Sequence, residues 1–588
     1  MKNLTSLRTQ MKERGLDAYL IVSGDPHSSE IVANHWRVRE WFSGFTGSAG
    51  LVVVTQKEAG LWTDGRYFIQ AEKELEGTGI SLFKDGEPGV PKYTEFLADK
   101  LPKNGRLGFD GRTIDYTEFE IIKKALSHKN ISYAYLEDVA GNLWADRPQM
   151  PTGKAFYHEA KFSGPENKLE IVRNKMKEKG YSFYLVSGLD DICWLANIRG
   201  SDVLHSPLVY SYVLITEKEA CLFVDTKKVL DITAKLNTAG FTISEYDSLP
   251  EKLKNLSKSG SILLNGKKTN IMLTEALPGS LTIVQKPSLD IIPLLKAVKS
   301  ETEIANMRNA YVRDSKVIVK TLIHIEEILD HGNEITECDV VEFLAESRKK
   351  EEYSLGDSFS TIVGYGANAA MMHYRPVNGG ATIKPEGLLL IDTGGQYLDG
   401  TTDTTRTFPV GPITDEMKKD FTLVLKGHIN LANAIFLKGT TGYALDVLAR
   451  QPLWQNCQNY RSGTGHGIGF CLGVHEGPQN IAPKPNTTEL LPGMVVSNEP
   501  GVYKEGRYGI RTENIILIEE YKQTEDGTFL NFTPLTYVPI SIDALDISLL
   551  TIEETKYLND YHKAVFDMLS PLLNEKENAW LKNATRPV

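Results

Sequence analysis

The stretch Leu388-Leu-Leu-Ile-Asp-Thr-Gly-Gly-Gln-Tyr397 predicts a β-strand, and Thr401-Thr-Asp-Thr-Thr-Arg-Thr-Phe408 predicts the next strand. Leu398-Asp-Gly400 between them has the composition of a turn. A hairpin about this turn places Asp392 and Asp403 nearly opposite one another. Two carboxylates that close repel strongly unless a cation lies between them. Asp392 ends a four-residue apolar run and is expected to be buried, so a pair of ordinary surface acids is the weaker interpretation.

The same arrangement occurs further along the chain. Val495-Val-Ser-Asn-Glu-Pro500 and Tyr508-Gly-Ile-Arg-Thr-Glu-Asn-Ile-Ile-Leu-Ile518 flank a turn centred on Gly506, and Glu499 and Glu513 lie symmetrically about that glycine. A single buried glutamate is usually the structural partner of an arginine. Two hairpins that each carry an acidic pair at mirrored positions instead favour one shared functional site.

A glycine-rich segment between the hairpins, Gly463-Thr-Gly-His-Gly-Ile-Gly469, leaves the ring of His466 accessible. A lone histidine is more often structural than a ligand, but this one joins four carboxylates. Such a set suits two divalent ions such as Mn²⁺, with Zn²⁺ or Co²⁺ as alternatives. Two ions a few ångströms apart can share a hydroxide, present it to a carbonyl and stabilise the oxyanion. The expected metal ligands are Asp392, Asp403, His466, Glu499 and Glu513, and they predict a dinuclear-metal peptidase.

Length and composition are those of a globular protein with several domains. The 588 residues exceed one ordinary core and suggest three to four domains. The net charge of −11 makes a nucleic-acid scaffold a poor interpretation. The scattered, odd-numbered cysteines indicate free thiols and a reducing compartment; they are Cys193, Cys221, Cys338, Cys457 and Cys471. The absence of a signal-peptide core and of a long apolar run predicts a cytoplasmic protein with no membrane partner.

The first half of the chain contains an internal repeat. Tyr19-Leu-Ile-Val-Ser-Gly24 recurs as Phe183-Tyr-Leu-Val-Ser-Gly188, and Thr55-Gln-Lys-Glu-Ala-Gly-Leu-Trp-Thr-Asp64 recurs as Thr216-Glu-Lys-Glu-Ala-Cys-Leu-Phe-Val-Asp225. The offsets of 164 and 161 residues are nearly equal, which predicts a duplicated α/β domain. Sequence similarity in the second copy fades after Ser261-Ile-Leu-Leu-Asn265.

The last domain is expected to begin near residue 300. Ser300 and Glu303 have capping-box spacing, and a long helix through about Ile325 follows. Thr336 to about Lys349 predicts a second helix, and strands with glycine-rich turns dominate from Ser360 onward.

The five ligands, their spacing and the sequence around them resemble the pita-bread metallopeptidases, which include methionine aminopeptidases, prolidases and Xaa-Pro aminopeptidases. The long, three-domain cytosolic type of aminopeptidase P resembles nearly the whole chain. The motifs that carry this resemblance are Ser23-Gly-Asp-Pro-His27, Phe42-Ser-Gly-Phe-Thr-Gly-Ser-Ala-Gly50, Trp62-Thr-Asp-Gly-Arg-Tyr-Phe68, Asp191-Ile-Cys-Trp-Leu-Ala-Asn-Ile-Arg-Gly200, Asp357-Ser-Phe to His373-Tyr, Val474-His-Glu-Gly-Pro478 and Trp580-Leu to Arg586-Pro587.

The resemblance implies a multidomain α/β and α+β fold, with two creatinase-like N-terminal α/β domains before a C-terminal pita-bread metallopeptidase domain. The expected domains are creatinase-like domain I at 1–150, creatinase-like domain II at 151–299, the catalytic domain at 300–525 and a C-terminal extension packed on it at 526–588. It also implies an enzyme that releases the N-terminal residue from peptides with proline in second position, and commonly a homodimer.

Metal roles follow from the same resemblance. Asp392 would chelate one metal, while Asp403 and Glu513 would bridge both. His466 and Glu499 would complete the two shells, and Glu499 would take the proton from the attacking water.

Substrate roles are implied for three further residues. His373 and His475 would contact the peptide and stabilise the transition state, and Arg66 would contact the peptide unless it is a surface arginine after a turn. Arg511 would support Glu513 from two residues away on the same strand face. One departure is Ser462, where long-type members commonly carry histidine; it leaves the metal set intact and concerns the wall of the proline pocket.

A prolidase acting on Xaa-Pro dipeptides shares the metal ligands and is the main alternative. A methionine aminopeptidase is disfavoured by the chain length, since those chains are little more than the catalytic domain. A non-catalytic binding protein or a metal-free creatinase-like enzyme is disfavoured because all five ligands are kept. An Xaa-Pro bond has no amide hydrogen, so its hydrolysis needs a pocket shaped for the ring and a route for a proton to the leaving nitrogen.

Overall fold

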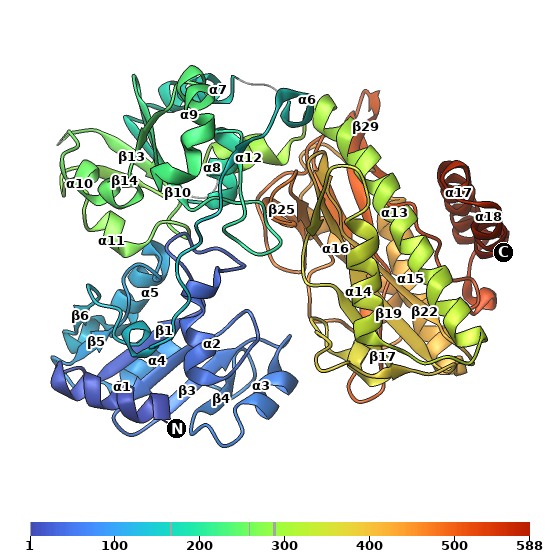
Figure 1. Ribbon diagram of the computed structural model, residues 1–588, viewed down its shortest axis with the longest axis horizontal. Helices are drawn as coiled ribbons and strands as arrows, with labels where there is room; N and C mark the ends of the chain where they lie inside the picture. Colours follow the sequence, from blue (N-terminus) through green and yellow to red (C-terminus); the bar gives the residue numbers. More distant parts are fainter. Residues whose placement is uncertain (1, 165–166, 258, 286–289) are drawn as a thin grey trace. The chain divides into compact units, whose positions relative to one another are not determined.

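The two copies of the sequence repeat form two six-stranded sheets of the same topology (Figure 1). Their strand orders are β4-β3-β2-β1-β5-β6 and β12-β11-β10-β8-β13-β14. In each sheet the central strand pairs antiparallel with the next strand, which pairs antiparallel with the third, and the remaining neighbours are parallel. The predicted duplication is therefore confirmed at the level of pairing.

The first sheet contains β1 (Ala18–Val22), β2 (Leu51–Thr55), β3 (Ala59–Thr63), β4 (Ser81–Lys84), β5 (Arg106–Gly108) and β6 (Ser132–Ala134). Its helices are α1 (Lys2–Glu13), α2 (Val38–Ser43), α3 (Phe68–Glu74), α4 (Tyr93–Lys100) and α5 (Tyr116–Leu126). The second sheet contains β8 (Phe183–Val186), β10 (Ser211–Thr216), β11 (Ala220–Val224), β12 (Thr242–Ser244), β13 (Ser261–Leu264) and β14 (Thr282–Val284). Its helices are α7 (Lys168–Lys179), α8 (Leu189–Leu195), α9 (Thr233–Thr238), α10 (Leu249–Lys254) and α11 (Ile271–Thr274).

The structural repeat extends one strand beyond the point where sequence similarity fades. Strand β14 pairs parallel with β13 through Ile262 and Ile283, as β6 pairs with β5. A short apolar strand can be built from many residue combinations, so topology is kept where the sequence signal is lost.

The computed structural model describes residues 2–164, 167–257, 259–285 and 290–588. It divides into two compact units, one of Met1–Tyr157 with Asn167–Ile292 and one of His158–Glu166 with Pro293–Val588. No helix among these described residues is both long and apolar enough to cross a membrane.

A buried histidine joins the two repeats within the first unit. His27 is fully buried, with Nδ1 2.8 Å from the carbonyl of Ser187 and Nε2 2.8 Å from the hydroxyl of Tyr246. Its ring lies 4.2 Å from that of Tyr212. The junction therefore holds a titratable ring between polar groups of the second repeat.

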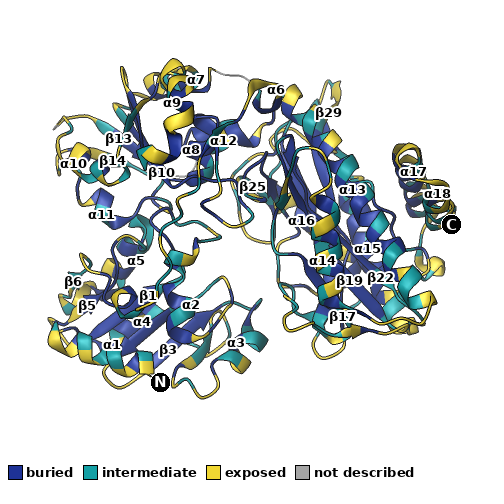
Figure 2. Ribbon diagram, in the orientation of Figure 1, coloured by how far each residue is buried: buried dark blue, intermediate teal, exposed yellow. Residues whose placement is uncertain are grey.

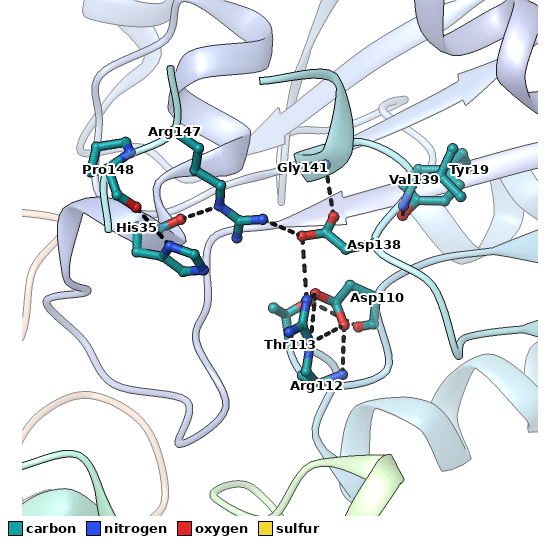
Figure 3. Close-up of polar contacts among 10 residues, drawn as sticks. All are labelled: Tyr19, His35, Asp110, Arg112, Thr113, Asp138, Val139, Gly141, Arg147 and Pro148. Carbon is teal, nitrogen blue, oxygen red and sulfur yellow. Dashed lines mark hydrogen bonds and ion pairs between the residues drawn. The ribbon is translucent and has the colours of Figure 1, made fainter. Parts of the chain in front are cut away.

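A second polar cluster ties the segment after β6 to the loop after β5 and to the turn that contains His35 (Figure 3). Asp138 accepts hydrogen bonds from Arg147 Nη1 at 2.7 Å and from the Gly141 N–H at 2.7 Å. The Arg147 Nε–H donates to the His35 carbonyl at 2.8 Å, and Arg112 bridges Asp138 and Asp110. Both carboxylates are thus paired, which allows their burial.

In the second unit, helices run alongside several small sheets (Figure 1). These helices are α13 (Glu301–Asp330), α14 (Glu337–Arg348), α15 (Asp415–Ala432) and α16 (Gly442–Trp454), followed by α17 (Ile552–Leu569) and α18 (Glu575–Ala584). The predicted helix starts are confirmed, because Ser300 and Thr336 form capping boxes with Glu303 and Asp339. Helix α13 continues five residues beyond the predicted end near Ile325.

The strands that position the acidic residues belong to three sheets, ordered β16-β20-β21, β17-β19-β22 and β23-β30-β29-β26-β24-β25, with β27 and β28 as a separate pair. Their bounds are β16 (Ser354–Asp357), β17 (Ile362–Tyr365), β19 (Leu388–Thr393), β20 (Gly395–Tyr397), β21 (Gly400–Thr401), β22 (Thr404–Pro409), β23 (Phe436–Leu437), β24 (Gly465–Ile468), β25 (His475–Ile481), β26 (Val495–Asn498), β27 (Gly501–Lys504), β28 (Tyr508–Arg511), β29 (Asn514–Thr524) and β30 (Gly527–Pro534). Most residues of the central strands are buried, whereas the helices turn exposed faces outward (Figure 2).

Helices α17 and α18 close one side of the second unit. Leu558 and Val565 of α17 and Leu581 of α18 share a core cluster with Phe421 and Val424 of α15. The extension thus belongs to the hydrophobic core of this unit.

Candidate metal centre

The first acidic hairpin brings Asp392 and Asp403 to one side of the sheet with a small offset from the prediction. Asp392 of β19 pairs with Thr405 of β22. Asp403 lies two residues before Thr405, just outside β22, so the carboxylates are diagonal neighbours. The difference arises because the hairpin continues through β20 and β21, whose pairing of Tyr397 with Gly400 fixes the register.

The second acidic hairpin has the predicted mirror register. Asn498 pairs with Asn514 and Gly501 pairs with Arg511, so Glu499 and Glu513 face each other in the break between these pairs. The turn residue at the centre, Gly506, has a φ of +71° that favours glycine. Both glutamates therefore leave the regular ladder at the same level.

His466 is held between these hairpins by β24. The Cβ that a side chain would add at Gly465 would lie 2.0 Å from the carbonyl of Ser497, so glycine permits the close approach of β26. The Nδ1 of His466 lies 2.9 Å from the carbonyl of Gly467. A carbonyl only accepts, so Nδ1 carries the hydrogen and Nε2 keeps a lone pair. Nε2 is 3.5 Å from Asp403 Oδ2 and 3.4 Å from Glu499 Oε1.

The five predicted ligands converge in overlapping groups. Within each group, one potential ligand atom of every residue lies within 4.8 Å of the others. The groups are Asp392 with Asp403 and Glu513, His466 with Glu499 and Glu513, and Asp403 with His466 and His475. Asp403, His466 and Glu513 each occur in two groups, so the groups adjoin one another; His475 is the one member that is not among the five predicted ligands.

Burial and mutual repulsion disfavour the charged forms of these carboxylates. Burial raises the pKa of Asp392 to about 6, although Arg511 opposes the rise. Burial also raises the pKa of Glu499, and it raises the pKa of Glu513 well above its usual range, with Asp403 adding to the latter. Asp392 Oδ1 is buried with no hydrogen-bond partner among the described residues. Divalent cations fit this site because they would compensate the charge and satisfy this oxygen.

Arg511 contacts a different carboxylate from the one expected. Its Nη2 lies 2.5 Å from Asp392 Oδ2, whereas its Nε–H donates to Thr405 Oγ1 at 3.0 Å. The Thr405 hydroxyl in turn donates to Glu513 Oε2 at 2.8 Å. In the contacts of the described residues, Arg511 therefore reaches Glu513 through Thr405. The strand break between β28 and β29 separates residues 511 and 513, which explains the difference.

Three residues that position the centre were missed by the sequence analysis. The hydroxyl of Thr405 links Arg511 to Glu513. The hydroxyl of Ser497 accepts a hydrogen bond from the backbone N–H of His466 at 2.9 Å and donates one to Glu499 at 3.1 Å. The hydroxyl of Tyr503 accepts a hydrogen bond from Arg511 at 2.7 Å. Thr405 has a sequence signal, because alternate residues of the threonine-rich strand share the face of Asp403. Ser497 and Tyr503 lie two and four residues from Glu499, where strand alternation could have indicated them.

The predicted substrate residues have different surroundings. His475 is exposed at the start of β25, and its ring lies 4.2 Å from that of His466. His373 is half-buried in the segment after the turn 366–370, which packs against β27 and β28. Ser462 is half-buried, and its carbonyl accepts from Arg450 at 2.7 Å. Arg66 belongs to the first unit, where its guanidinium pairs with both oxygens of Asp64 at 2.8 Å.

The chain matches known families along nearly its whole length. Residues 305–520 match metallopeptidase family M24, and residues 528–588 match the C-terminal region of peptidase M24. Residues 3–140 and residues 146–303 each match the creatinase/prolidase N-terminal domain.

Several relatives align end to end. A probable Xaa-Pro aminopeptidase P of Laccaria bicolor is 39% identical, with 100% of this chain and 93% of the relative covered. Aminopeptidase P2 of Arabidopsis thaliana is 38% identical, with 100% and 88% covered. The crystal structure of an X-prolyl aminopeptidase from Caenorhabditis elegans, described as a cytosolic enzyme with a di-nuclear active site, has a TM-score of 0.95 at 33% identity and covers 100% of this chain and 99% of its own.

The duplicated sheets, the mirrored acidic hairpins and these matches define a peptidase of the metal-dependent class, and the chain belongs to metallopeptidase family M24. The predicted fold class, with two creatinase-like domains before a pita-bread domain, is confirmed. The predicted resemblance to the long type of Xaa-Pro aminopeptidase is also confirmed by its full-length relatives.

Proposed function

We propose that this chain is an aminopeptidase that releases the N-terminal residue from peptides with proline in the second position. The observation that carries the proposal is the convergence of four carboxylates and one imidazole in a chain that aligns end to end with Xaa-Pro aminopeptidases. The prolidase alternative is not favoured, because the full-length relatives are named as aminopeptidases.

The proposed metal ligands are Asp392, Asp403, His466, Glu499 and Glu513. Asp392 would bind one cation and His466 with Glu499 the other, while Asp403 and Glu513 would bind both. This division is supported by Asp392 and the pair of His466 and Glu499, which fall in separate groups that share Glu513. Two divalent cations would activate water for attack and polarise the scissile carbonyl. Mn²⁺ is the proposed metal because the set is rich in oxygen.

Protein groups supply the remaining chemistry. Glu499 is the proposed general base; its raised pKa supports a role in accepting a proton. Arg511 pairs with Oδ2 of Asp392, so the buried Oδ1 of that carboxylate is the atom that would hold a cation. His475 and His373 are the proposed substrate contacts, and one of them would deliver a proton to the leaving proline nitrogen. The exposure of His475 beside the ring of His466 supports its role.

Arg66 is proposed to contact the peptide, and Ser462 to line the proline pocket. The bidentate pairing of Arg66 with Asp64 orients its guanidinium, which supports a specific rather than a random surface role.

A comparison of substrates tests the proposal. The purified protein with Mn²⁺ should hydrolyse Arg-Pro-Pro and other Xaa-Pro-Yaa peptides with a higher kcat/KM than Xaa-Pro dipeptides, and it should leave Xaa-Ala-Yaa controls intact. Preference for dipeptides would favour a prolidase instead. Full activity in excess chelator would contradict the metal-dependent mechanism.

Localisation, assembly and domain limits are further parts of the proposal. The cytosolic description of the Caenorhabditis elegans enzyme supports a cytoplasmic protein.

A homodimer is supported by an exposed apolar face of α16. This face contains Tyr443, Val447 and Trp454, which are 49%, 44% and 49% exposed. Sedimentation of the Val447→Asp variant should show more monomer than the wild type.

The proposed domains remain 1–150, 151–299, 300–525 and 526–588, supported by the family matches to similar ranges.

A further inference from the structure

Arg406 is a buried cation that binds only neutral oxygen atoms in its described contacts. It lies on β22 with 3% of its surface exposed. Its acceptors are the carbonyls of Thr405 (2.8 Å), Glu513, Val538 (2.8 Å) and Pro539 (3.0 Å), Oδ1 of Asn514 (2.7 Å) and the hydroxyl of Tyr561 (2.9 Å). Because a guanidinium presents its donors in one rigid plane, Arg406 fixes three segments relative to each other: β22, the strand break at Glu513 and the extension after residue 525.

Arg406 holds the backbone carbonyl of Glu513. The N–H of Glu513 donates to the Thr405 carbonyl at 3.2 Å, and the Glu513 carbonyl accepts from Arg406 Nη1. The same Nη1 donates to the carbonyl of Thr405, whose hydroxyl holds the Glu513 carboxylate. Glu513 lies outside the regular ladder, so these bonds replace strand pairing in setting its position relative to Asp403.

Tyr561 holds the opposite edge of the same guanidinium. Its hydroxyl accepts from Arg406 Nη2 at 2.9 Å and lies 2.9 Å from the Val538 carbonyl and 3.3 Å from Asn514 Oδ1. The ring is buried in the core cluster of α15 and α17, so the position of the hydroxyl is set by helix packing. A path of direct contacts thus runs from α17 through Arg406 to Glu513.

We propose that Tyr561 is a positioning residue for Glu513, acting through Arg406, so that the C-terminal extension sets the affinity of the centre for metal. This inference rests on the proposed function, in which Glu513 is a ligand of both cations. Groups that orient metal ligands typically change metal affinity by about 10–100-fold when removed. Because Tyr561 acts through one intermediate residue, we expect an effect at or just below the lower limit of this range, about 5–10-fold.

The test compares Tyr561→Phe with Tyr557→Phe in the full chain. Tyr557 lies one turn earlier on α17 and packs against the same core cluster, but its hydroxyl makes no hydrogen bond with the residues that the structure describes. Each protein is stripped with a chelator and titrated with Mn²⁺ by calorimetry, and bound metal is counted after dialysis. We expect Tyr561→Phe to bind Mn²⁺ about 5–10-fold more weakly, Tyr557→Phe to match the wild type, and kcat of both to recover in saturating Mn²⁺.

Unchanged Mn²⁺ affinity in Tyr561→Phe, or equal weakening in both variants, would overturn the inference. A lower melting temperature of the metal-free Tyr561→Phe protein at unchanged Mn²⁺ affinity would also overturn it, since that is a purely structural effect. Should Tyr561→Phe fail to fold, Asn514→Ala removes the oxygen shared by Arg406 and Tyr561 and is titrated in its place. A wild-type protein that binds no Mn²⁺ or cleaves no Xaa-Pro peptide would contradict the proposed function itself, separately from this comparison.

Discussion

Nη2 of Arg511 lies 2.5 Å from Oδ2 of Asp392, so an ion pair joins the second acidic hairpin to the first. Asp392 nevertheless has a pKa raised to about 6, because burial outweighs the attraction of the guanidinium. In the absence of metal, the charged form of this carboxylate therefore opposes folding.

Asp392→Asn is expected to stabilise the metal-free protein at pH 7 by about 1–3 kcal/mol, since a two-unit pKa shift corresponds to about 3 kcal/mol. Because the pKa is raised, Asp392 in the folded wild type keeps a proton between about pH 4 and pH 6, where the same residue in the unfolded chain has lost it. The contribution of Asp392 to the free energy of unfolding is therefore fully present at pH 4 and is lost as the pH rises through 6. The advantage of the variant should disappear near pH 4.

Urea denaturation of both chelator-treated proteins at pH 4, 5.5 and 7 measures this difference. With Mn²⁺ added, the order should reverse, because ligand binding stabilises only the protein that keeps the site. A wild type that stays more stable at pH 7 without metal would contradict the prediction.

His475→Ala is expected to retain both metals and to lose turnover of Arg-Pro-Pro by about 100-fold or more, the range of general acid–base catalysis. The ring of His475 is exposed and lies 4.2 Å from the ring of the proposed ligand His466. Metal content per chain and kcat are measured together, with the exposed His331→Ala as the matched control. Because His475 also groups with Asp403 and His466, loss of one metal would instead make it a ligand.

His27 is expected to make the first unit sensitive to acid. Burial lowers its pKa to about 4, so the folded state keeps the neutral ring while the unfolded chain binds a proton below about pH 6.5. Stability is therefore fully present above pH 6.5 and falls by up to about 3 kcal/mol as the pH approaches 4.

His27→Gln should be less stable than the wild type at pH 7 and should lose less stability between pH 7 and pH 4.5. Differential scanning calorimetry at the two pH values measures the change, with the exposed His128→Gln as control. Burial also lowers the pKa of His428 in the second unit to about 3, so His428 contributes to the loss of stability in acid as well. The informative quantity is therefore the difference in stability between His27→Gln and the wild type at each pH. Parallel pH profiles of His27→Gln and the wild type would rule out this role.

Glu476 is expected to be a major determinant of stability beside the centre. It points to the opposite face of β25 from His475 and is buried with Lys299, its ion-pair partner, and Lys296, whose Nζ is 3.6 Å away. Glu476→Gln should destabilise the protein by about 3–5 kcal/mol, because it leaves buried ammonium groups beside a neutral amide. Urea unfolding against the exposed control Glu489→Gln checks this; a loss below about 0.5 kcal/mol, typical of surface changes, would contradict it.

Much of the fold was predictable because its signals are local. The capping boxes at Ser300 and Thr336 locate two helices within a few residues, since a cap acts on its own first turn. The repeated motifs predicted two domains because similar strands and turns recur at a nearly constant offset. The last strand of the second sheet, β14, was missed, since a short apolar strand needs no specific sequence.

In the candidate site, too, local features were predicted from the sequence and long-range contacts were not. The symmetry of Glu499 and Glu513 about Gly506 follows from one turn, so the register was predicted correctly. The offset between Asp392 and Asp403 was missed because the pairing of Tyr397 with Gly400 in β20 and β21 sets the register of the whole hairpin. Thr405 and Tyr503 were missed because their importance depends on the direction of the Arg511 side chain.

The sequence by itself determined which side chains carry the chemistry and which of them face each other across a turn, because residue type and strand period act over a few residues. Only the tertiary structure decided that Arg511 binds Asp392, 119 residues away, and that Tyr561 reaches Glu513 through Arg406, 155 residues from Tyr561. Those contacts follow from the packing of sheets and helices against one another. The physical reason is that a buried charged or polar group must pair with a group that folding brings close in space, and residue type and strand period do not indicate which group that is.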